Sequence, residues 1–134
     1  MLDRDAVVRA CDTFAAAITS HDVDAIMALF AEETSLAEPL GAERQFGHEP
    51  IRAFFDSNKH VPFILRRMSP VTVVGYYAAF QNRIEVIEDD GAKRMVSTHL
   101  IRFDDDLKIS ELSVLPDHDS DPDDPALPTG KANF

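Results

Sequence analysis

Hydrophobic residues recur at three- and four-residue steps in the first part of the chain, the spacing of one face of an α-helix. This pattern predicts a helix over about 5–20 and a short second helix through Phe30, for which Asp22 is a suitable N-terminal cap. Pro50 fits the first turn of a third helix over about 49–57. The apolar side chains predicted on the inner faces are Val7, Val8, Cys11, Phe14, Ala15, Ile18, Val23, Ile26, Met27, Phe30, Ile51, Phe54 and Phe55.

The second half has a different pattern, rich in β-branched and aromatic residues that alternate in places. We predict four strands, over residues 63–74, 77–88, 93–103 and 107–115. The segments Asp89-Asp90-Gly91 and Asp104-Asp105-Asp106 have the composition of hairpin turns, and 41–47 is a predicted polar loop. Helices followed by an antiparallel meander predict an α+β fold, with the helices packed on one face of a curved sheet.

Composition sets the domain organisation. A chain of 134 residues with 45% hydrophobic residues is long enough for one globular domain with its own core. The net charge is −11, and residues 117–134 contain five aspartates against one lysine. We therefore predict a folded domain over 1–116 and an acidic, disordered tail over 117–134. The acidic balance argues against a nucleic-acid partner, which would require a basic face.

The single cysteine, Cys11, falls among apolar positions of the first predicted helix, so we interpret it as a packing residue. It cannot form an internal disulfide. No charged-then-apolar leader opens the chain, and no apolar run reaches membrane-spanning length. We expect a cytoplasmic protein that does not enter a membrane.

Glu38 is the first candidate for chemistry. It precedes a Pro-x-Gly turn on a predicted short strand, where period-two alternation would place it on one face with Leu36 and Leu40. One interpretation is an exposed glutamate near a turn, since unpaired acids are seldom fully buried. The other is an acid that points into an apolar cavity, where desolvation would raise its pKa and make it a usable general base.

His99 is the second candidate, because it lies at the centre of a mostly apolar strand face that includes Met95, Ser97, Ile101 and Phe103. A lone strand histidine is more often a hydrogen-bonded core or edge residue than a catalytic one. The five histidines show no ligand-type spacing, so we predict no metal site. The chain also has no glycine-rich phosphate loop and no serine nucleophile elbow.

Several short segments together resemble the ketosteroid isomerase branch of the SnoaL-like, nuclear-transport-factor-like superfamily. They are LFAEE (29–33), EPLG (38–41), GHEPIRAFF (47–55), AAF (78–80) and IRF (101–103). The resemblance implies a conical α+β fold, in which three N-terminal helices pack on a strongly curved antiparallel sheet that encloses an apolar pocket. It also implies a homodimer.

The resemblance places Glu38 at the family's general-base position, where an aspartate is usual. Phe14 and His99 stand at the two positions that form the family's oxyanion hole, a tyrosine and a protonated aspartic acid, and Phe55 replaces a supporting aromatic hydroxyl. Phe14 cannot donate a hydrogen bond, whereas His99 can. Candidates to replace the lost donor are Ser97, Tyr76 and Tyr77.

We therefore expect an isomerase of the steroid delta-isomerase type, without cofactor or metal, that moves a proton in a small hydrophobic ketone through a dienolate. Glu38 would be the general base and His99 the oxyanion donor. The residues predicted to bind the substrate are Phe14, Phe30, Phe54, Phe55, Leu36, Leu40, Phe80, Val86, Ser97 and Ile101. The alternatives are another SnoaL-like reaction, such as that of a cyclase or dehydratase, a non-catalytic binder of small apolar ligands, or a dimerising domain with no ligand.

Overall fold

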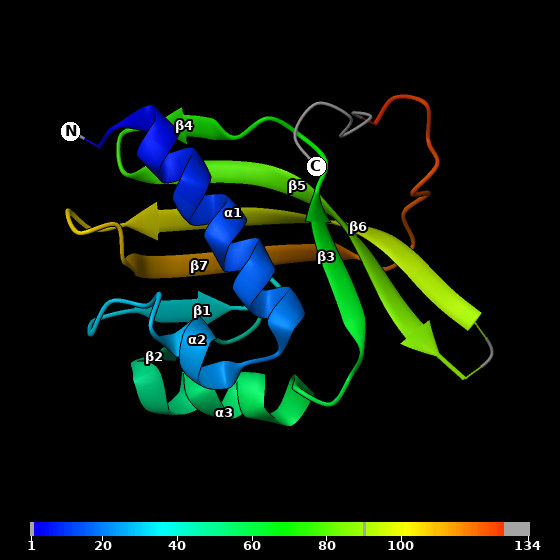
Figure 1. Ribbon diagram of the computed structural model, residues 1–134, viewed down its shortest axis with the longest axis horizontal. Coiled ribbons are helices and arrows are strands. Elements are labelled where there is room, and N and C mark those ends of the chain that lie inside the picture. Colours follow the sequence, from blue (N-terminus) through cyan, green and yellow to red (C-terminus); the bar gives the residue numbers. More distant parts are fainter. Residues whose placement is uncertain (1, 90, 128–134) are drawn as a thin grey trace.

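The computed structural model describes residues 2–89 and 91–127, and Figure 1 shows the path of the chain. Its elements in order are α1 (Arg4–Ser20), α2 (Val23–Met27), β1 (Ser35–Ala37), β2 (Gln45–Phe46), α3 (His48–Asn58), β3 (Phe63–Arg67), β4 (Thr72–Val74), β5 (Tyr77–Glu88), β6 (Gly91–Phe103) and β7 (Ile109–Asp117). This is the predicted α+β architecture, with helices packed against a curved and mostly antiparallel sheet.

The three helices form where the hydrophobic period predicts them. Asp3 caps α1 by accepting a hydrogen bond from the Ala6 N–H at 3.0 Å, and Asp22 caps α2 in the same way. The second helix ends at Met27, so its predicted extension through Phe30 is wrong. The reason is tertiary pairing, because Phe30 forms a bridge with Ile109 and leaves the helix to do so.

The sheet has the strand order β2-β1-β7-β6-β5-β3, and β4 also pairs with β5. The long strands β5, β6 and β7 form the predicted antiparallel meander, joined through the two aspartate-rich hairpins. Asp90, in the first hairpin, lies outside the described residues. One pairing was not predicted: β1 lies parallel to β7, with Leu36 opposite Leu112. This pairing brings the end of β1 beside the middle of the sheet.

Several strand boundaries differ from the prediction, and the last strand, predicted over 107–115, is shifted by two residues to Ile109–Asp117. The run predicted as one strand over 63–74 is divided into β3 and β4 by a segment that contains Ser69 and Pro70. Ser69 accepts a hydrogen bond from the Gln81 N–H through its side chain at 2.8 Å, which replaces a ladder bond. Residues 45–46 form β2 on β1 instead of a loop, and β6 begins two residues earlier than predicted.

The helices cover the concave face of the sheet, and α1 crosses the long strands in Figure 1. The core lies between the two layers and includes Cys11, which is buried as predicted and whose thiol pKa is raised to about 12, mainly by burial. Among the described helices, none is long and apolar enough to cross a membrane.

The first part of the acidic segment lies against the sheet. Within residues 117–127, Ser120 accepts a hydrogen bond from the Val96 N–H at 2.8 Å, and the Pro122 carbonyl accepts one from Arg83. Asp123 forms an ion pair with Arg94 at 2.9 Å. Residues 128–134, to which the predicted disorder also refers, lie outside the described part of the chain. The segment up to residue 127 therefore follows the edge of the fold through specific contacts.

Candidate active site

A cavity of about 370 Å³ opens between the helices and the concave face of the sheet. This volume falls within the range of about 300–1,000 Å³ that is usual for small-molecule sites. Its lining is mostly apolar and comes from α1, α3 and the long strands. The lining residues are Phe14, Ile18, Glu38, Pro39, Phe54, Phe55, Asn58, Val61, Phe63, Leu65, Ile84, Val86, Met95, His99, Leu112, Val114, Pro116 and His118.

Glu38 lines this cavity immediately beyond the end of β1. Burial raises the pKa of its carboxyl from 4.5 to about 7. Its carboxyl oxygens form no hydrogen bond or ion pair with any residue that the structure describes. Glu38 is therefore an acid that can both take up and release a proton near neutral pH.

The predicted face of Leu36, Glu38 and Leu40 does not exist as one strand face. Leu36 is fully buried in the core, whereas Leu40 is 50% exposed. The alternation stops because β1 ends at Ala37 and the chain turns at Pro39, after a cis peptide bond. Glu38 reaches the cavity from the turn, not from the strand.

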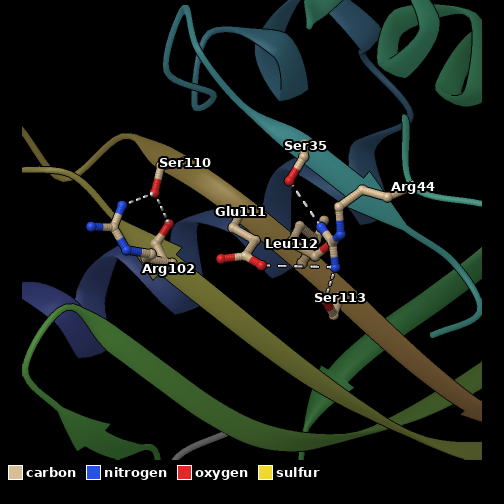
Figure 2. Close-up of polar contacts among 7 residues, drawn as sticks. All are labelled: Ser35, Arg44, Arg102, Ser110, Glu111, Leu112 and Ser113. Atoms are coloured by element: carbon tan, nitrogen blue, oxygen red, sulfur yellow. Dashed lines mark hydrogen bonds and ion pairs between the residues drawn. The ribbon is translucent and has the colours of Figure 1, made fainter. Parts of the chain in front are cut away.

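Two sets of hydrogen bonds hold this turn on the sheet. The Leu40 N–H donates to the Val114 carbonyl of β7 at 2.8 Å. Beyond the turn, the guanidinium of Arg44 donates to Ser35 of β1 at 2.9 Å and also to Ser113 of β7 (Figure 2). Because Arg44 joins the parallel pair β1–β7 from outside, it fixes the backbone that carries Glu38.

His99 lies in the middle of β6 and faces the same cavity. Its ring is stacked on Phe80, with centroids 5.6 Å apart and an interplanar angle of 12°, and the ring of Phe14 meets it edge-on at 5.7 Å. Burial lowers the pKa of His99 to about 4, so the imidazole is neutral at pH 7. Its Nδ1 lies 2.7 Å from the side-chain nitrogen of Asn82.

The cavity therefore combines two titratable groups whose pKa values burial has shifted in opposite directions, in each case toward the neutral form. Neither Glu38 nor His99 forms an ion pair with another described residue; around pH 7 the imidazole is neutral and the carboxyl is about half protonated. A pair of groups of this kind suits acid–base chemistry on an uncharged molecule, with the carboxyl moving a proton and the imidazole providing a hydrogen bond.

The structure brings part of the predicted set together. Along with Glu38 and His99, four predicted binding residues line the cavity, namely Phe14, Phe54, Phe55 and Val86. The other six lie elsewhere: five are buried in the protein interior, and Leu40 is on the surface. The five interior residues are Phe30, Leu36, Phe80, Ser97 and Ile101.

Neither tyrosine proposed as a replacement donor reaches the cavity. Tyr76 donates its hydroxyl hydrogen to Asp105 at 2.6 Å at the other end of the sheet, and Tyr77 is exposed beside Arg102. The two residues fall in the turn into β5, far along the strand from the lining residues Ile84 and Val86.

Asn82 is the functional candidate that the sequence interpretation missed. It is fully buried on β5. The available signal was its period-two spacing from Phe80 and Ile84, which places an amide on an inward, apolar face. Over the part of the chain that is described, no cluster of three or more His, Cys, Asp or Glu side chains is placed to hold a metal ion.

Comparison with solved structures shows the same fold in two enzymes. The epoxide hydrolase/cyclase-like enzyme SalBIII, with a role in pyran ring formation in the polyether salinomycin, has a TM-score of 0.79 and 18% identity, covering 87% of this chain and 95% of that one. An LEH-like epoxide hydrolase from M. tuberculosis has a TM-score of 0.70 and 17% identity, covering 83% of this chain and 82% of that one. Neither is a steroid isomerase, so these likenesses give no support to the steroid branch that the motifs indicated.

The sequence itself matches one family model, that of the SnoaL-like domain, over residues 11–112. The matched region runs from the middle of α1 to β7 and contains Glu38, His99 and nearly all of the cavity lining. With this match and the conical α+β fold, the chain belongs to the SnoaL-like domain family.

Proposed function

We propose that this protein is an acid–base enzyme that moves a proton in a small, neutral, apolar ketone, with Glu38 as general base and His99 as hydrogen-bond donor. One observation carries the proposal: an unpaired carboxyl group with a pKa of about 7 and a neutral imidazole line the same apolar cavity. A general base is most effective when its pKa lies near the working pH.

The proposed substrate is a ketone with a carbon–carbon double bond β,γ to its carbonyl, and the Glu38 carboxylate removes a proton from the carbon between the two groups, so that the enolate formed is a dienolate. The electron pair of the broken C–H bond moves into the carbonyl to give an enolate, whose oxygen accepts a hydrogen bond from His99. Glu38, now protonated, returns the proton at another carbon of the conjugated system. The double bond has then moved, and the enzyme is in its starting state.

The neutral state of His99 favours this reaction over one that forms a localised alkoxide. A neutral imidazole is a very weak acid, so it stabilises an oxyanion by hydrogen bonding and does not transfer its proton outright. An enolate spreads its charge over carbon and oxygen and needs no full proton transfer. The triosephosphate isomerase site, with a glutamate base and a neutral histidine, uses the same division of work.

The second candidate is the opening of an epoxide, and the fold shared with two epoxide hydrolase-like enzymes favours it. Here the protonated form of Glu38 would give its proton to the epoxide oxygen while water, or a hydroxyl of the substrate, attacks the ring carbon. The attacking oxygen would then return a proton to Glu38. A carboxyl with a pKa of about 7 is half protonated at neutral pH, so the acid form is available.

A turnover assay on two probes separates these candidates. Wild-type protein is incubated with Δ5-androstenedione, followed by the absorbance of the conjugated enone, and with styrene oxide, followed by formation of the diol. Glu38→Gln is compared with Glu33→Gln, an exposed glutamate outside the cavity. Enone formation that Glu38→Gln abolishes and Glu33→Gln preserves supports the ketone reaction.

Diol formation without enone formation would replace the first candidate by the second. If neither probe reacts, saturable binding of androstenedione would instead support a non-catalytic binder of apolar ligands. The homodimer that the family resemblance implies also stays a proposal, which sedimentation equilibrium of the purified chain would test.

A further inference from the structure

Three polar side chains are buried together on the concave face of the sheet beside the cavity. Asn82 of β5 is 0% exposed, and Ser97 and His99 of β6 are 1% and 5% exposed. Asn82 lies directly opposite Ser97 in the strand register, and His99 is two residues further along β6. Of the three, only His99 lines the cavity.

The hydrogen bond between Asn82 and His99 determines which ring nitrogen carries the proton. The amide nitrogen of Asn82 is a donor only, and it lies 2.7 Å from Nδ1 of His99. Nδ1 must therefore accept, so the single proton of the neutral imidazole is on Nε2. Nε2 forms no hydrogen bond with any other described residue, and the ring borders the cavity.

The unpaired atoms nearby agree with this orientation of the amide. The carbonyl oxygen of Asn82 and the hydroxyl of Ser97 are both buried without a hydrogen-bond partner among the described residues. One is an acceptor, the other can donate, and the two residues are directly opposite on neighbouring strands. Turning the amide over would instead require a proton on Nδ1 and would leave both N–H donors of Asn82 without that partner.

We infer that Asn82 is a positioning residue that holds the proton of His99 on Nε2, and that the cavity consequently selects uncharged ligands that present a hydrogen-bond acceptor, such as a ketone oxygen. The inference rests on the proposed function in that it gives His99 the same role of donor. It goes further by naming the residue that enforces the role and the ligand chemistry that follows. A ligand that offers only a donor at this depth would leave two N–H or O–H groups facing each other.

The first test is the tautomer of His99, read from the nitrogen NMR shifts of the ring in protein labelled at histidine. In the wild type at pH 7, we expect the proton on Nε2. In Asn82→Asp the new carboxylate accepts a hydrogen bond, so we expect the proton to be on Nδ1 or the ring to become charged. Gln81→Glu, the same kind of change at the next residue, which lies on the other face of β5, should leave the wild-type tautomer.

A wild-type proton on Nδ1 would overturn the inference, as would an unchanged tautomer in a folded Asn82→Asp variant. The wild-type measurement needs no variant to fold and no substrate to react. It therefore stays decisive even if the turnover assays fail, which separates the failure of this inference from the failure of the proposed function.

The second test measures ligand selection with two probes of the same shape. trans-Decalone presents a ketone oxygen, and its exocyclic methylene analogue does not. We expect the wild-type protein to bind the ketone about fivefold more tightly, the effect of one neutral hydrogen bond, and to move the Nε2 resonance of His99 on binding. In Asn82→Asp this preference should disappear where the NMR shifts place the single ring proton on Nδ1, and it should persist where the ring is charged, because Nε2 then still carries a proton. Equal binding of both probes by the wild type would contradict the inference.

Discussion

Buried polar groups occur in two arrangements in this protein, one with charged partners and one without. Between α1 and β3, Arg67 is 5% exposed, and its guanidinium donates to both oxygens of Asp12, at 2.7 and 3.1 Å, and to the Ser69 carbonyl. In the cavity, Glu38 and His99 have no charged partner among the described residues. The paired region, Arg67 with Asp12, ties α1 to the sheet. The unpaired region, Glu38 with His99, keeps shifted pKa values and hydrogen-bonding groups that a ligand can use.

The difference shows what each arrangement costs. A buried charge with several partners stabilises the fold or has little net effect on its stability, whereas removing one of the partners destabilises the fold. A buried titratable group without partners costs stability at any pH where it would normally be charged. Such a cost in an apolar cavity is a reason to assign chemistry to the groups there.

The largest expected effect comes from Glu38→Gln on catalysis. Glutamine keeps the shape of the side chain but cannot accept a proton, so kcat should fall by about 10²–10⁴ on the probe that the wild type converts. Steady-state kinetics measures this change beside Glu33→Gln. If Glu38→Gln retained wild-type kcat, Glu38 would not be the base.

The next effect is that of His99→Ala, which removes the donor and one wall of the cavity. Loss of one oxyanion donor typically lowers kcat by about 10²–10³. His60→Ala, at an exposed histidine outside the cavity, is the matched control. A rise in KM with unchanged kcat would show that the ring packs against the substrate without stabilising the transition state.

Titration of the two cavity groups should change stability in opposite directions. The pKa of Glu38 is about 7 in the folded protein against 4.5 ordinarily, so its contribution is fully present below pH 4.5 and is lost as the pH rises through about 7, by about 3 kcal/mol. The pKa of His99 is lowered from 6.5 to about 4, so its contribution is present above pH 6.5 and is lost as the pH falls through about 4.

Urea unfolding from pH 4 to pH 8 separates the two contributions. Relative to the wild type, Glu38→Gln should gain stability progressively as the pH rises from 4.5 to about 7 and keep that gain to pH 8, because it removes the titration of Glu38. A stability difference that stays constant with pH would mean that the carboxyl of Glu38 has an ordinary pKa.

The paired region should respond more weakly. In Asp12→Ala, Arg67 loses two hydrogen bonds but keeps its bond to the Ser69 carbonyl, so we expect a loss of about 1–3 kcal/mol in the free energy of unfolding. Catalysis should change little, since neither residue lines the cavity. A fall in kcat as large as that of Glu38→Gln would show that the Asp12–Arg67 pair also serves catalysis and not stability alone.

The smallest effect is expected from removing residues 119–134, a deletion that keeps the cavity-lining His118. The deletion takes away the contacts of Ser120, Pro122 and Asp123 with β5 and β6, of which the ion pair is exposed and worth about 0–1 kcal/mol. The chain should still fold, with a slightly lower Tm and activity of the same order. A large fall in Tm would mean that this segment is part of the folded domain.

Local patterns in the sequence determined most of the secondary structure. Helix periodicity, the cap Asp22 and the aspartate-rich hairpins depend on neighbours within a few residues, and the structure follows them closely. The same local logic identified Glu38 and His99, because each interrupts an apolar pattern, and it indicated that burial would raise the pKa of a glutamate in a cavity.

Only the tertiary structure decided how these parts meet. The parallel contact between β1 and β7 joins segments about 75 residues apart, and no local pattern encodes it. The end of β1 at Ala37, the placement of Phe80 behind the His99 ring, and the bond from Asn82 all depend on which strands lie side by side. Side-chain alternation gives a residue's face, whereas the register between strands gives its neighbours, and the chemistry of this cavity depends on the neighbours.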